Sequence, residues 1–163
     1  MSDCFATLAM TDTFDVSCHL FHDSFTMAYW LLKADPKKYS WERLVQDGET
    51  SWDGVRNYQA RNSLKEMKVG DLAFVYDAGD DKEIRGIAEI VKEAYPDPTA
   101  EEGNWVSVGV KAMKACTRPL HFEEIRNTYG LTVMPLVEQP RVSVHPVTEA
   151  QWQAILKYTK TSL

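Results

Sequence analysis

The alternation of apolar and polar residues after Met27 predicts five strands. The first is AYWLLK, a short apolar run that ends at Lys33. The other four runs are rich in β-branched and aromatic residues and are bounded by turn-forming residues. They are DLAFVYD (71–77), IRGIAEIVKEAY (84–95), NWVSVGVKAMKAC (104–116) and PRVSVHPV (140–147).

Two helices are predicted in the first half of this region. Ser40 is expected to cap a short helix that ends at Gly48, because serine is a preferred N-cap and glycine a preferred stop. A second helix is predicted from about Asn57 to Met67. Its apolar residues recur at i, i+4 and i+7 and form one stripe, which consists of Ala60, Leu64 and Met67.

Two further helices are predicted near the C-terminus. HFEEIRNTYG (121–130) has Gly130 as its expected stop, and TEAQWQAILKY (148–158) has Thr148 as its expected cap. Strands and helices are interspersed without a regular βαβ alternation. This order favours an α+β fold with a curled or barrel-like sheet over a doubly wound sheet.

Length and composition predict one domain with a sizeable core, since the chain has 163 residues and 44% of them are hydrophobic. No apolar run approaches the ~18 residues that span a bilayer, which excludes a membrane-spanning class. The three cysteines are an odd number without CxxC spacing, so neither a disulfide framework nor a zinc site is indicated. A reducing, cytoplasmic setting is therefore expected.

The first 26 residues differ from the rest of the chain. They carry four aspartates and no lysine or arginine, so the remainder has a net charge of -2 where the whole chain has -6. They keep no regular period and do not resemble a signal peptide. One hypothesis is that Met27 is the natural start and that residues 1–26 are a disordered tail or a gene-start artefact. The alternative is an N-terminal extension that packs on the surface.

The charge balance limits the kind of partner. A near-neutral domain lacks the broad basic field that gives tight nonspecific binding to nucleic acid. Any contact with nucleic acid is therefore expected to be local and to depend on shape.

The segment WDGVRNYQARN (52–62) concentrates hydrogen-bonding side chains beside an aromatic ring. If the apolar stripe of the second helix faces the core, Arg56 and Asn57 lie within about 60° of it and are partly buried. A buried polar group without a partner costs about 1–3 kcal/mol, so these side chains either brace loops or point into a cavity. Gly54 would let the backbone approach an occupant closely, and Trp52 could form a flat wall. Such a site suits a planar heterocycle such as a nucleobase.

These residues resemble the EVE domain family. The matching segments are YWLLKADP, YSWERLVQDGETSWDGVRNYQARNSLKEMKVGDLAFVY, GIAEIVKEAYPDPTA, WVSVGV and QPRVSVHPVTEAQWQAIL, in this order from Ala28 to Tyr158. The resemblance implies a single domain over 27–163 with an α+β, PUA-like pseudo-barrel of mixed strands surrounded by helices. It also implies a pocket for a modified base, in the family modified cytosine in DNA, and binding without catalysis or cofactor.

The resemblance also suggests which residues contact the ligand. Trp52 would be the stacking wall. The rim, the hydrogen-bonding edge and the closing side of the pocket would come from Lys33, Asp53, Gly54, Arg56, Asn57 and Tyr76. Gln59 and Arg61 would contact phosphates or flanking nucleotides.

Two positions depart from the family pattern. Ala34 stands where the family commonly has serine, so one hydroxyl is missing. After Tyr76 the chain has DAGDDKE (77–83) where the family often has His-Ser. If this acidic loop lies near the mouth of the pocket, it should weaken phosphate contacts.

Structural roles compete with the binding roles. Trp52 could be a core residue, Arg56 and Asn57 could fasten the helix start to neighbouring loops, and Asp53 could be a helix N-cap. The other tryptophans are expected in the core because they fall in strand or helix patterns; they are Trp30, Trp41, Trp105 and Trp152.

Catalytic motifs are weak. His121 and His145 are expected to be structural or exposed, Cys116 to be a small buried residue, and the pair Glu123 and Glu124 to lie on a solvated helix face. The chain has no GxSxG, HExxH, Walker or deaminase motif, and no metal is expected.

Three classes of function remain. The first is a reader of a modified base in DNA, flipped or single-stranded. The second is a PUA-like protein that binds tRNA or rRNA. The third is a sensor or enzyme for a free nucleoside, for which only Asp53 or Lys33 offers an acid or base. The expected partner is nucleic acid with a modified base, with a separate effector protein as a further partner and no membrane.

Overall fold

The computed structural model describes residues 27–163, so the hypotheses about residues 1–26 lie outside it. Six strands form one mixed, unclosed sheet in the order β2-β5-β4-β3-β1-β6. Only the pairing of β1 with β3 is parallel. The strands are β1 (Tyr29–Ala34), β2 (Glu49–Trp52), β3 (Leu72–Asp77), β4 (Glu83–Pro96), β5 (Val106–His121) and β6 (Val144–Val147).

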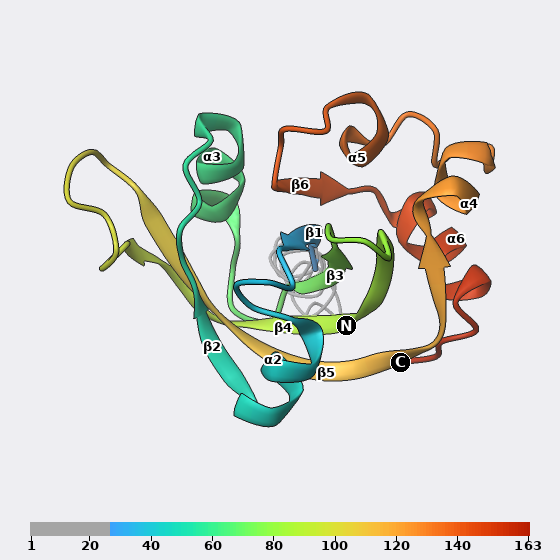
Figure 1. The fold of residues 1–163 in the computed structure, drawn as a ribbon, viewed down its shortest axis with the longest axis horizontal. Helices are drawn as coiled ribbons and strands as arrows, with labels where there is room; N and C mark the ends of the chain where they lie inside the picture. The colour runs from blue at the N-terminus through green and yellow to red at the C-terminus, as the bar shows by residue number, and fades with distance from the viewer. Residues whose placement is uncertain (1–26) are drawn as a thin grey trace, which may run out of the picture.

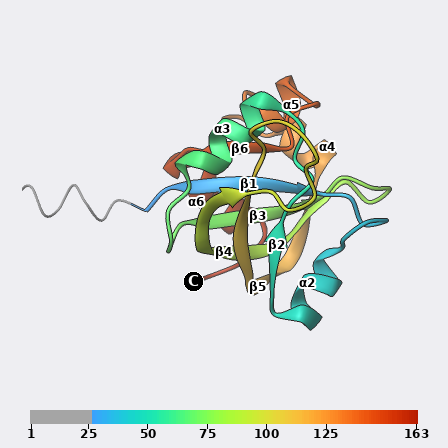
Figure 2. The same ribbon diagram turned by 90° about the vertical axis from the view of Figure 1, so that its left-hand side faces the viewer.

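Within residues 27–163, five helices lie around the sheet: α2 (Trp41–Asp47), α3 (Tyr58–Glu66), α4 (Phe122–Asn127), α5 (Pro135–Glu138) and α6 (Glu149–Tyr158). The long strands β4 and β5 curl, and α3 lies beside β6, in the gap of the open barrel (Figure 1). In Figure 2, α3 lies above β1, and α2 lies below it, at the start of β2. The predicted α+β fold with a barrel-like sheet is confirmed.

The predicted helix boundaries are largely confirmed. The Ser40 side chain accepts a hydrogen bond from the amide of Arg43 (3.2 Å), and Gly48 ends α2 with a φ of 79°. Thr148 caps α6 and forms a reciprocal capping box with Gln151. For α3 the N-cap is Asn57, whose side chain accepts from the amide of Ala60 (3.0 Å). Asp53 is therefore not the N-cap, because the helix begins only at Tyr58.

Other predictions differ from the structure. The helix α4 ends at Asn127, and Gly130, with a φ of 86°, lies in the turns beyond it. β6 is shorter than its predicted segment because residues 140–143 form a turn and bend before the strand. The elements β2 and α5 were not predicted. β2 has only four residues, ETSW, and is a strand because it pairs with β5 from Trp52↔Val108 to Glu49↔Lys111.

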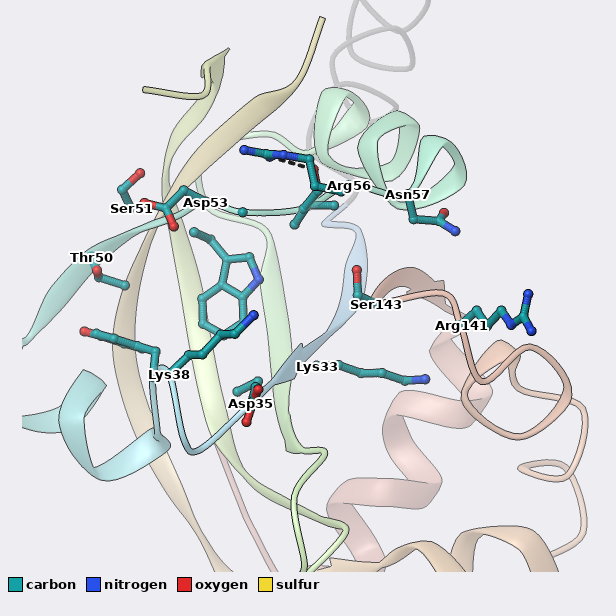
Figure 3. A pocket seen from close by; sticks show the side chains of 15 residues that line it. Lys33, Asp35, Lys38, Thr50, Ser51, Asp53, Arg56, Asn57, Arg141 and Ser143 are labelled. Carbon is teal, nitrogen blue, oxygen red and sulfur yellow. Dashed lines mark hydrogen bonds between the residues drawn. The ribbon is translucent and has the colours of Figure 1, made fainter. Parts of the chain in front are cut away.

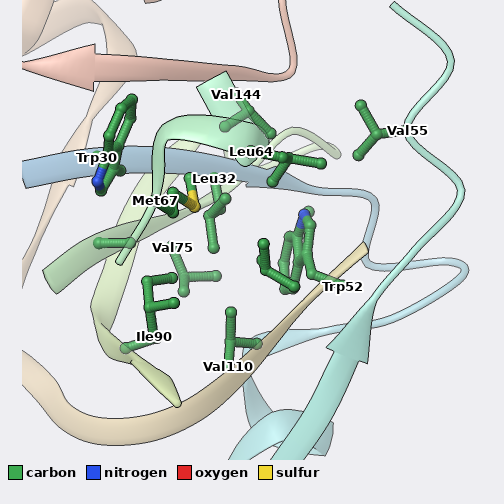
Figure 4. Packing of buried hydrophobic residues seen from close by; sticks show 14 of the residues in the cluster. Trp30, Leu32, Trp52, Val55, Leu64, Met67, Val75, Ile90, Val110 and Val144 are labelled. Atoms are coloured by element: carbon green, nitrogen blue, oxygen red, sulfur yellow. The ribbon is translucent and has the colours of Figure 1, made fainter. Parts of the chain in front are cut away.

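Apolar residues pack on both faces of the sheet. Successive side chains of a strand point to opposite faces, so Leu32 joins one cluster and Leu31 the other. The first cluster includes the predicted stripe of α3, whose residues Ala60, Leu64 and Met67 are fully buried. Figure 4 shows this cluster, with Trp52 packed among its side chains. The second cluster lies under α6 and contains Phe74, Tyr76 and Trp152.

The prediction that four tryptophans are core residues is confirmed for three. Trp30, Trp41 and Trp152 are buried. Trp105 is the exception: it is half-buried, belongs to neither cluster and lies against Tyr58, with a ring-centroid distance of 5.1 Å. It is the last residue of the β4–β5 loop and lies outside the strands that build the two clusters. No helix in the described part of the chain is long and apolar enough to cross a membrane.

Candidate functional site

A pocket of about 650 Å³ lies between the end of β1, the strand β2, the loop that leads to α3, and the segment before β6. Figure 3 shows side chains from all of these segments around one cavity. Its lining residues are Lys33, Ala34, Asp35, Lys38, Tyr39, Thr50, Ser51, Trp52, Asp53, Gly54, Val55, Arg56, Asn57, Arg141 and Ser143.

Trp52 is both a core residue and a wall of this pocket. It is only 8% exposed and packs in the same apolar cluster as Leu32, Trp41 and Val110, yet it lines the cavity. Pairing with Val108 on β5 fixes the backbone of Trp52 in the sheet. The two roles considered from the sequence are therefore compatible. An indole held in this way offers a rigid aromatic surface, which a ligand can contact without ordering the ring.

The loop from Asp53 to Asn57 is anchored by Asp97. The buried carboxylate of Asp97 accepts hydrogen bonds from the amide of Gly54 (3.0 Å), the guanidinium of Arg56 (2.7 Å) and the amide of Thr99 (2.7 Å). Burial alone would raise the pKa of Asp97, but the hydrogen bonds from Thr99, Arg56 and Gly54 lower this pKa to about 2. Asp97 is thus charged at neutral pH and joins the pocket loop to the β4–β5 loop.

Arg56 is held on the rim of the pocket. Besides Asp97, its guanidinium donates to the hydroxyl of Thr99 (3.0 Å) and to the carbonyl of Val55 (3.0 Å). These contacts support the structural alternative, in which Arg56 fastens the loop. Its side chain stays 38% exposed, so part of the guanidinium can still contact a ligand.

Asn57 and Asp53 have different surroundings. The Asn57 side-chain oxygen caps α3, and its amide nitrogen has no acceptor within residues 27–163, so it is available to a ligand. Asp53 lies at the rim and is exposed as a residue. Partial burial of its carboxylate and the nearby negative charge of Asp97 raise its pKa. Gly54 has a φ of 74°, a conformation that other residues adopt only at a cost, and faces open space.

The structure separates Tyr76 from the other predicted pocket residues. Tyr76 lies on the opposite face of the sheet from Trp52 and lines a second cavity of about 320 Å³ with Phe122 and Leu136. Burial and the charge of Asp77 raise the pKa of Tyr76 to about 12. Lys33 lines both cavities; its ammonium donates to the carbonyl of Pro140 (2.9 Å), and burial lowers its pKa.

Gln59 and Arg61 lie on α3, outside the lining of the pocket. Gln59 is exposed. The guanidinium carbon of Arg61 is 5.0 Å from the ring centroid of Tyr58 and 5.7 Å from that of Trp105. Their positions are compatible with the predicted flanking contacts.

Nine lining residues were not among the site residues predicted from the sequence: Ala34, Asp35, Lys38, Tyr39, Thr50, Ser51, Val55, Arg141 and Ser143. Arg141 and Ser143 reach the pocket because the segment before β6 runs beside β1, where the amide of Lys33 donates to the carbonyl of Ser143 (2.9 Å). No local signal marks residues so distant in the sequence. The Ser143 hydroxyl makes no hydrogen bond to the described residues and offers the pocket a donor that Ala34 lacks.

The lining of the pocket is positively charged in an acidic protein. Four basic side chains (Lys33, Lys38, Arg56, Arg141) outnumber two acidic ones (Asp35, Asp53), whereas the whole chain carries -6. An anion is thus attracted locally and not by the protein as a whole.

The acidic loop after Tyr76 does not line the pocket. Arg85 pairs with Asp77 (3.6 Å), Asp81 (2.6 Å) and Glu83 (2.8 Å), and also with Glu42 (3.4 Å). These contacts partly neutralise the loop. The expected weakening of phosphate contacts depended on the loop lying at the pocket mouth, and the structure does not place it there.

Neither His121 nor His145 lines the pocket. His145 is buried beside β1, and burial lowers its pKa to about 4, so it is neutral at pH 7. His121 is exposed and lies 3.1 Å from Glu83. Cys116 is half-buried, and burial raises the pKa of its thiol. Within residues 27–163, no three histidine, cysteine or acidic side chains are grouped to hold a metal ion.

The open, mixed sheet with helices around it is an α+β, PUA-like fold, as in the solved structures that resemble it. The EVE domain model matches residues 28–158, and the chain belongs to this family. Thymocyte nuclear protein 1 of Mus musculus is 35% identical over 167 residues, covering 82% of this chain and 74% of the relative.

Solved structures agree with this assignment. Protein Atu2648 of Agrobacterium tumefaciens has a TM-score of 0.80 and 35% identity, over 82% of this chain and 94% of its own. Human THYN1, solved in complex with DNA that contains 5-methylcytosine, has a TM-score of 0.77 and 30% identity, over 83% and 99% of the two chains. A YTH domain of Zygosaccharomyces rouxii shares the fold alone, at a TM-score of 0.55 and 13% identity.

Proposed function

We propose that this protein binds nucleic acid by holding one modified base in the pocket against Trp52, and that it catalyses no reaction. Modified cytosine in DNA is the favoured ligand, because the human relative is solved with DNA that contains 5-methylcytosine. The observation that carries the proposal is the position of Trp52, which is locked in the core and still lines a cavity of about 650 Å³. Such a volume lies in the usual range of about 300–1,000 Å³ for ligand pockets.

A base must leave the helix stack to enter such a pocket, so the ligand is a flipped or single-stranded nucleotide. One face of the base would stack on Trp52. The Asn57 amide and the Ser143 hydroxyl, both without acceptors in the described region, would read its hydrogen-bonding edge. Lys33, Asp53 and Arg56 would line the rim, with Gly54 letting the backbone approach. Gln59 and Arg61 would contact flanking nucleotides.

Binding without reaction fits the groups at the pocket. Acid–base or nucleophilic catalysis needs a reactive group and a partner that orients it. In the part of the chain that the structure describes, no side chain donates a hydrogen bond to the Asp53 carboxylate, and the Lys33 ammonium is held by a backbone carbonyl. Neither residue has the partner that a catalytic role requires.

The test is a titration by fluorescence anisotropy with matched single-stranded oligonucleotides. They carry cytosine, 5-methylcytosine, 5-hydroxymethylcytosine or N6-methyladenine, each in DNA and in RNA. We expect tighter binding to one modified base. The same binding constant for all oligonucleotides would contradict the proposal. A preference seen only among the RNA oligonucleotides would show that RNA, and not DNA, carries the modified base.

Trp52→Phe tests the wall of the pocket. The smaller ring keeps most of the core volume but stacks on less of the base. The affinity for the modified base should therefore decrease, by less than the roughly 5- to 150-fold (about 1–3 kcal/mol) that loss of all stacking would cost. Trp41→Phe is the matched control, because Trp41 is equally buried (8%), belongs to the same cluster and does not line the pocket. Equal losses in both variants would assign the effect to the core.

A further inference from the structure

We propose that three side chains next to the pocket, Tyr58, Arg61 and Trp105, hold the nucleotide adjacent to the bound base in the same strand. We call this cluster the aromatic–arginine step. The adjacent base would stack on Tyr58, and a phosphate beside it would pair with Arg61. This inference rests on the proposed function and adds a second contact point for the strand.

The geometry of the step is that of a prepared stacking surface. Tyr58 is the first residue of α3 and is 67% exposed. Trp105 is the last residue of the β4–β5 loop, directly before β5. Their ring centroids are 5.1 Å apart at an interplanar angle of 31°. Trp105 and the guanidinium of Arg61 both contact Tyr58, so its ring is oriented before a ligand binds. Preorganisation of this kind reduces the entropy lost on binding.

The step is continuous with the pocket through Arg56. This residue lines the pocket, and its guanidinium carbon lies 5.7 Å from the ring centroid of Trp105. Asn57, another lining residue, directly precedes Tyr58. When a nucleic-acid strand places one base in the pocket, its next nucleotide would therefore lie at the aromatic–arginine step.

The charge of Arg61 points to an anionic partner. Of the seven arginines in the chain, five pair with a carboxylate in the described region: Arg43, Arg56, Arg85, Arg118 and Arg126. The two others are Arg61 and Arg141, and Arg141 lines the pocket. Within residues 27–163, Arg61 makes one hydrogen bond, to the side-chain oxygen of Asn62 (3.3 Å), and has no carboxylate partner. A guanidinium with free donors suits a phosphate.

An exposed tyrosine is by itself ordinary, because single apolar side chains are common on protein surfaces. Tyr129 provides the comparison: it is fully exposed and makes no aromatic or cation–π contact with the described residues. Tyr58 differs because two other side chains hold its ring and because it adjoins the pocket. The shared chemistry of the three residues fits stacking and phosphate pairing, and a base of any identity can stack there.

The test uses the full-length protein and a single-stranded oligonucleotide with one 5-methylcytosine and with 2-aminopurine as its 5′ or its 3′ neighbour. Binding should change the fluorescence of 2-aminopurine at one of these two positions. Tyr58→Ala should abolish this change and weaken binding roughly 5- to 150-fold, because stacking of one base is lost. The ratio between methylated and unmethylated ligands should stay the same.

Arg61→Gln tests the phosphate contact. It should make the slope of log K against log salt shallower by about 0.7, as expected for the loss of one phosphate contact on a single strand. Tyr129→Ala and Arg126→Gln are the controls for the two variants and should bind as the wild type does, since both residues are exposed and lie on or beyond α4.

The outcomes separate this inference from the proposed function. If the wild type prefers 5-methylcytosine but Tyr58→Ala retains full affinity and the 2-aminopurine signal, the step is not a binding surface and the pocket proposal stands. If the wild type shows no preference for any modified base, the proposed function fails and the inference fails with it. If Tyr58→Ala loses both affinity and preference, the tyrosine belongs to the base pocket and the inference is overturned.

Discussion

The carboxylate of Asp97 is buried and receives hydrogen bonds from the loop beside the pocket and from its own turn. It accepts from the amide of Gly54 and the guanidinium of Arg56, and also from Thr99. A buried charge is tolerated only when its hydrogen bonds are made. Asp97 is therefore the residue that determines the position of the loop between Trp52 and α3.

Replacing Asp97 should destabilise the protein. In Asp97→Ala the donors of Gly54 and Arg56 lose their acceptor, and a hydrogen bond to a charged group contributes about 1.5–3 kcal/mol to stability. Urea denaturation would measure the loss. Asp80→Ala removes an exposed aspartate without an ion pair in the described region and should cost little. A loss below about 1 kcal/mol in Asp97→Ala would show that the anchor is weak.

The stability should also depend on pH through Asp97. Burial opposes ionisation, but the hydrogen bonds of Thr99, Arg56 and Gly54 prevail and hold the pKa at about 2, below the ordinary value of 3.8. A lowered carboxylate pKa stabilises the fold above the unfolded pKa, and this contribution is lost as pH falls toward the folded pKa. Between about pH 4 and pH 2 the wild type should lose about 2 kcal/mol from this group. Asp97→Ala should lack this part of the pH dependence in urea denaturation at pH 4.5, 3 and 2.

At the scale of single elements, α3 links the core to the pocket. Its buried stripe of Ala60, Leu64 and Met67 packs in the first apolar cluster, and its N-cap Asn57 lines the pocket. A helix start of this kind carries amides without acceptors, which a capping side chain satisfies. The side-chain oxygen of Asn57 thus caps the helix, while its side-chain amide nitrogen can donate to a ligand.

Substitutions of Asn57 can separate these two roles. Asn57→Ala should lower the unfolding free energy by about 1 kcal/mol through loss of the cap. Asn57→Asp keeps a capping oxygen but removes the amide donor, so it should fold with near wild-type stability and bind the modified base more weakly. Thr148→Ala is the control, because it removes the cap of α6 away from the pocket and should leave binding unchanged. Unchanged binding by Asn57→Asp would assign Asn57 to the helix alone.

At the scale of the whole molecule, the net charge and the charge of the site have opposite signs. The chain carries -6, whereas the pocket lining has more basic than acidic side chains, and Arg61 and Arg141 have no carboxylate partner in the described region. The field that steers a nucleic acid is therefore short-ranged. Under the proposed function, binding would therefore depend on the fit of the base more than on phosphate contacts.

The salt dependence of binding should be weak. If Arg61 and Arg141 contact one phosphate each, the slope of log K against log salt for a single strand should be about -1.4, from about -0.7 per contact. Arg141→Gln should reduce it by about half. A titration between low and moderate salt measures the slope. A value steeper than about -3 would require more phosphate contacts than these two residues can make.

Much of the fold could be predicted from the sequence because its signals are local. The cap at Ser40, the cap at Thr148 and the stripe of α3 each depend on residues within a few turns of one helix, and the structure confirms all three. β2 could not be predicted in this way. Its polar sequence has little preference for a strand, and only the pairing with β5 makes it one.

The sequence by itself determined the ends of α2, α3 and α6, most strands and a loop rich in hydrogen-bonding groups around Trp52. Only the tertiary structure decided which side chains meet at the pocket. Arg141 and Ser143 line the pocket because their segment runs beside β1. Asp97, the residue that follows β4, anchors the loop between Trp52 and α3. Tyr76 lies on the other face of the sheet from Trp52, because the direction of a strand side chain changes with every residue. Such contacts depend on strand register and face, which are properties of the assembled sheet.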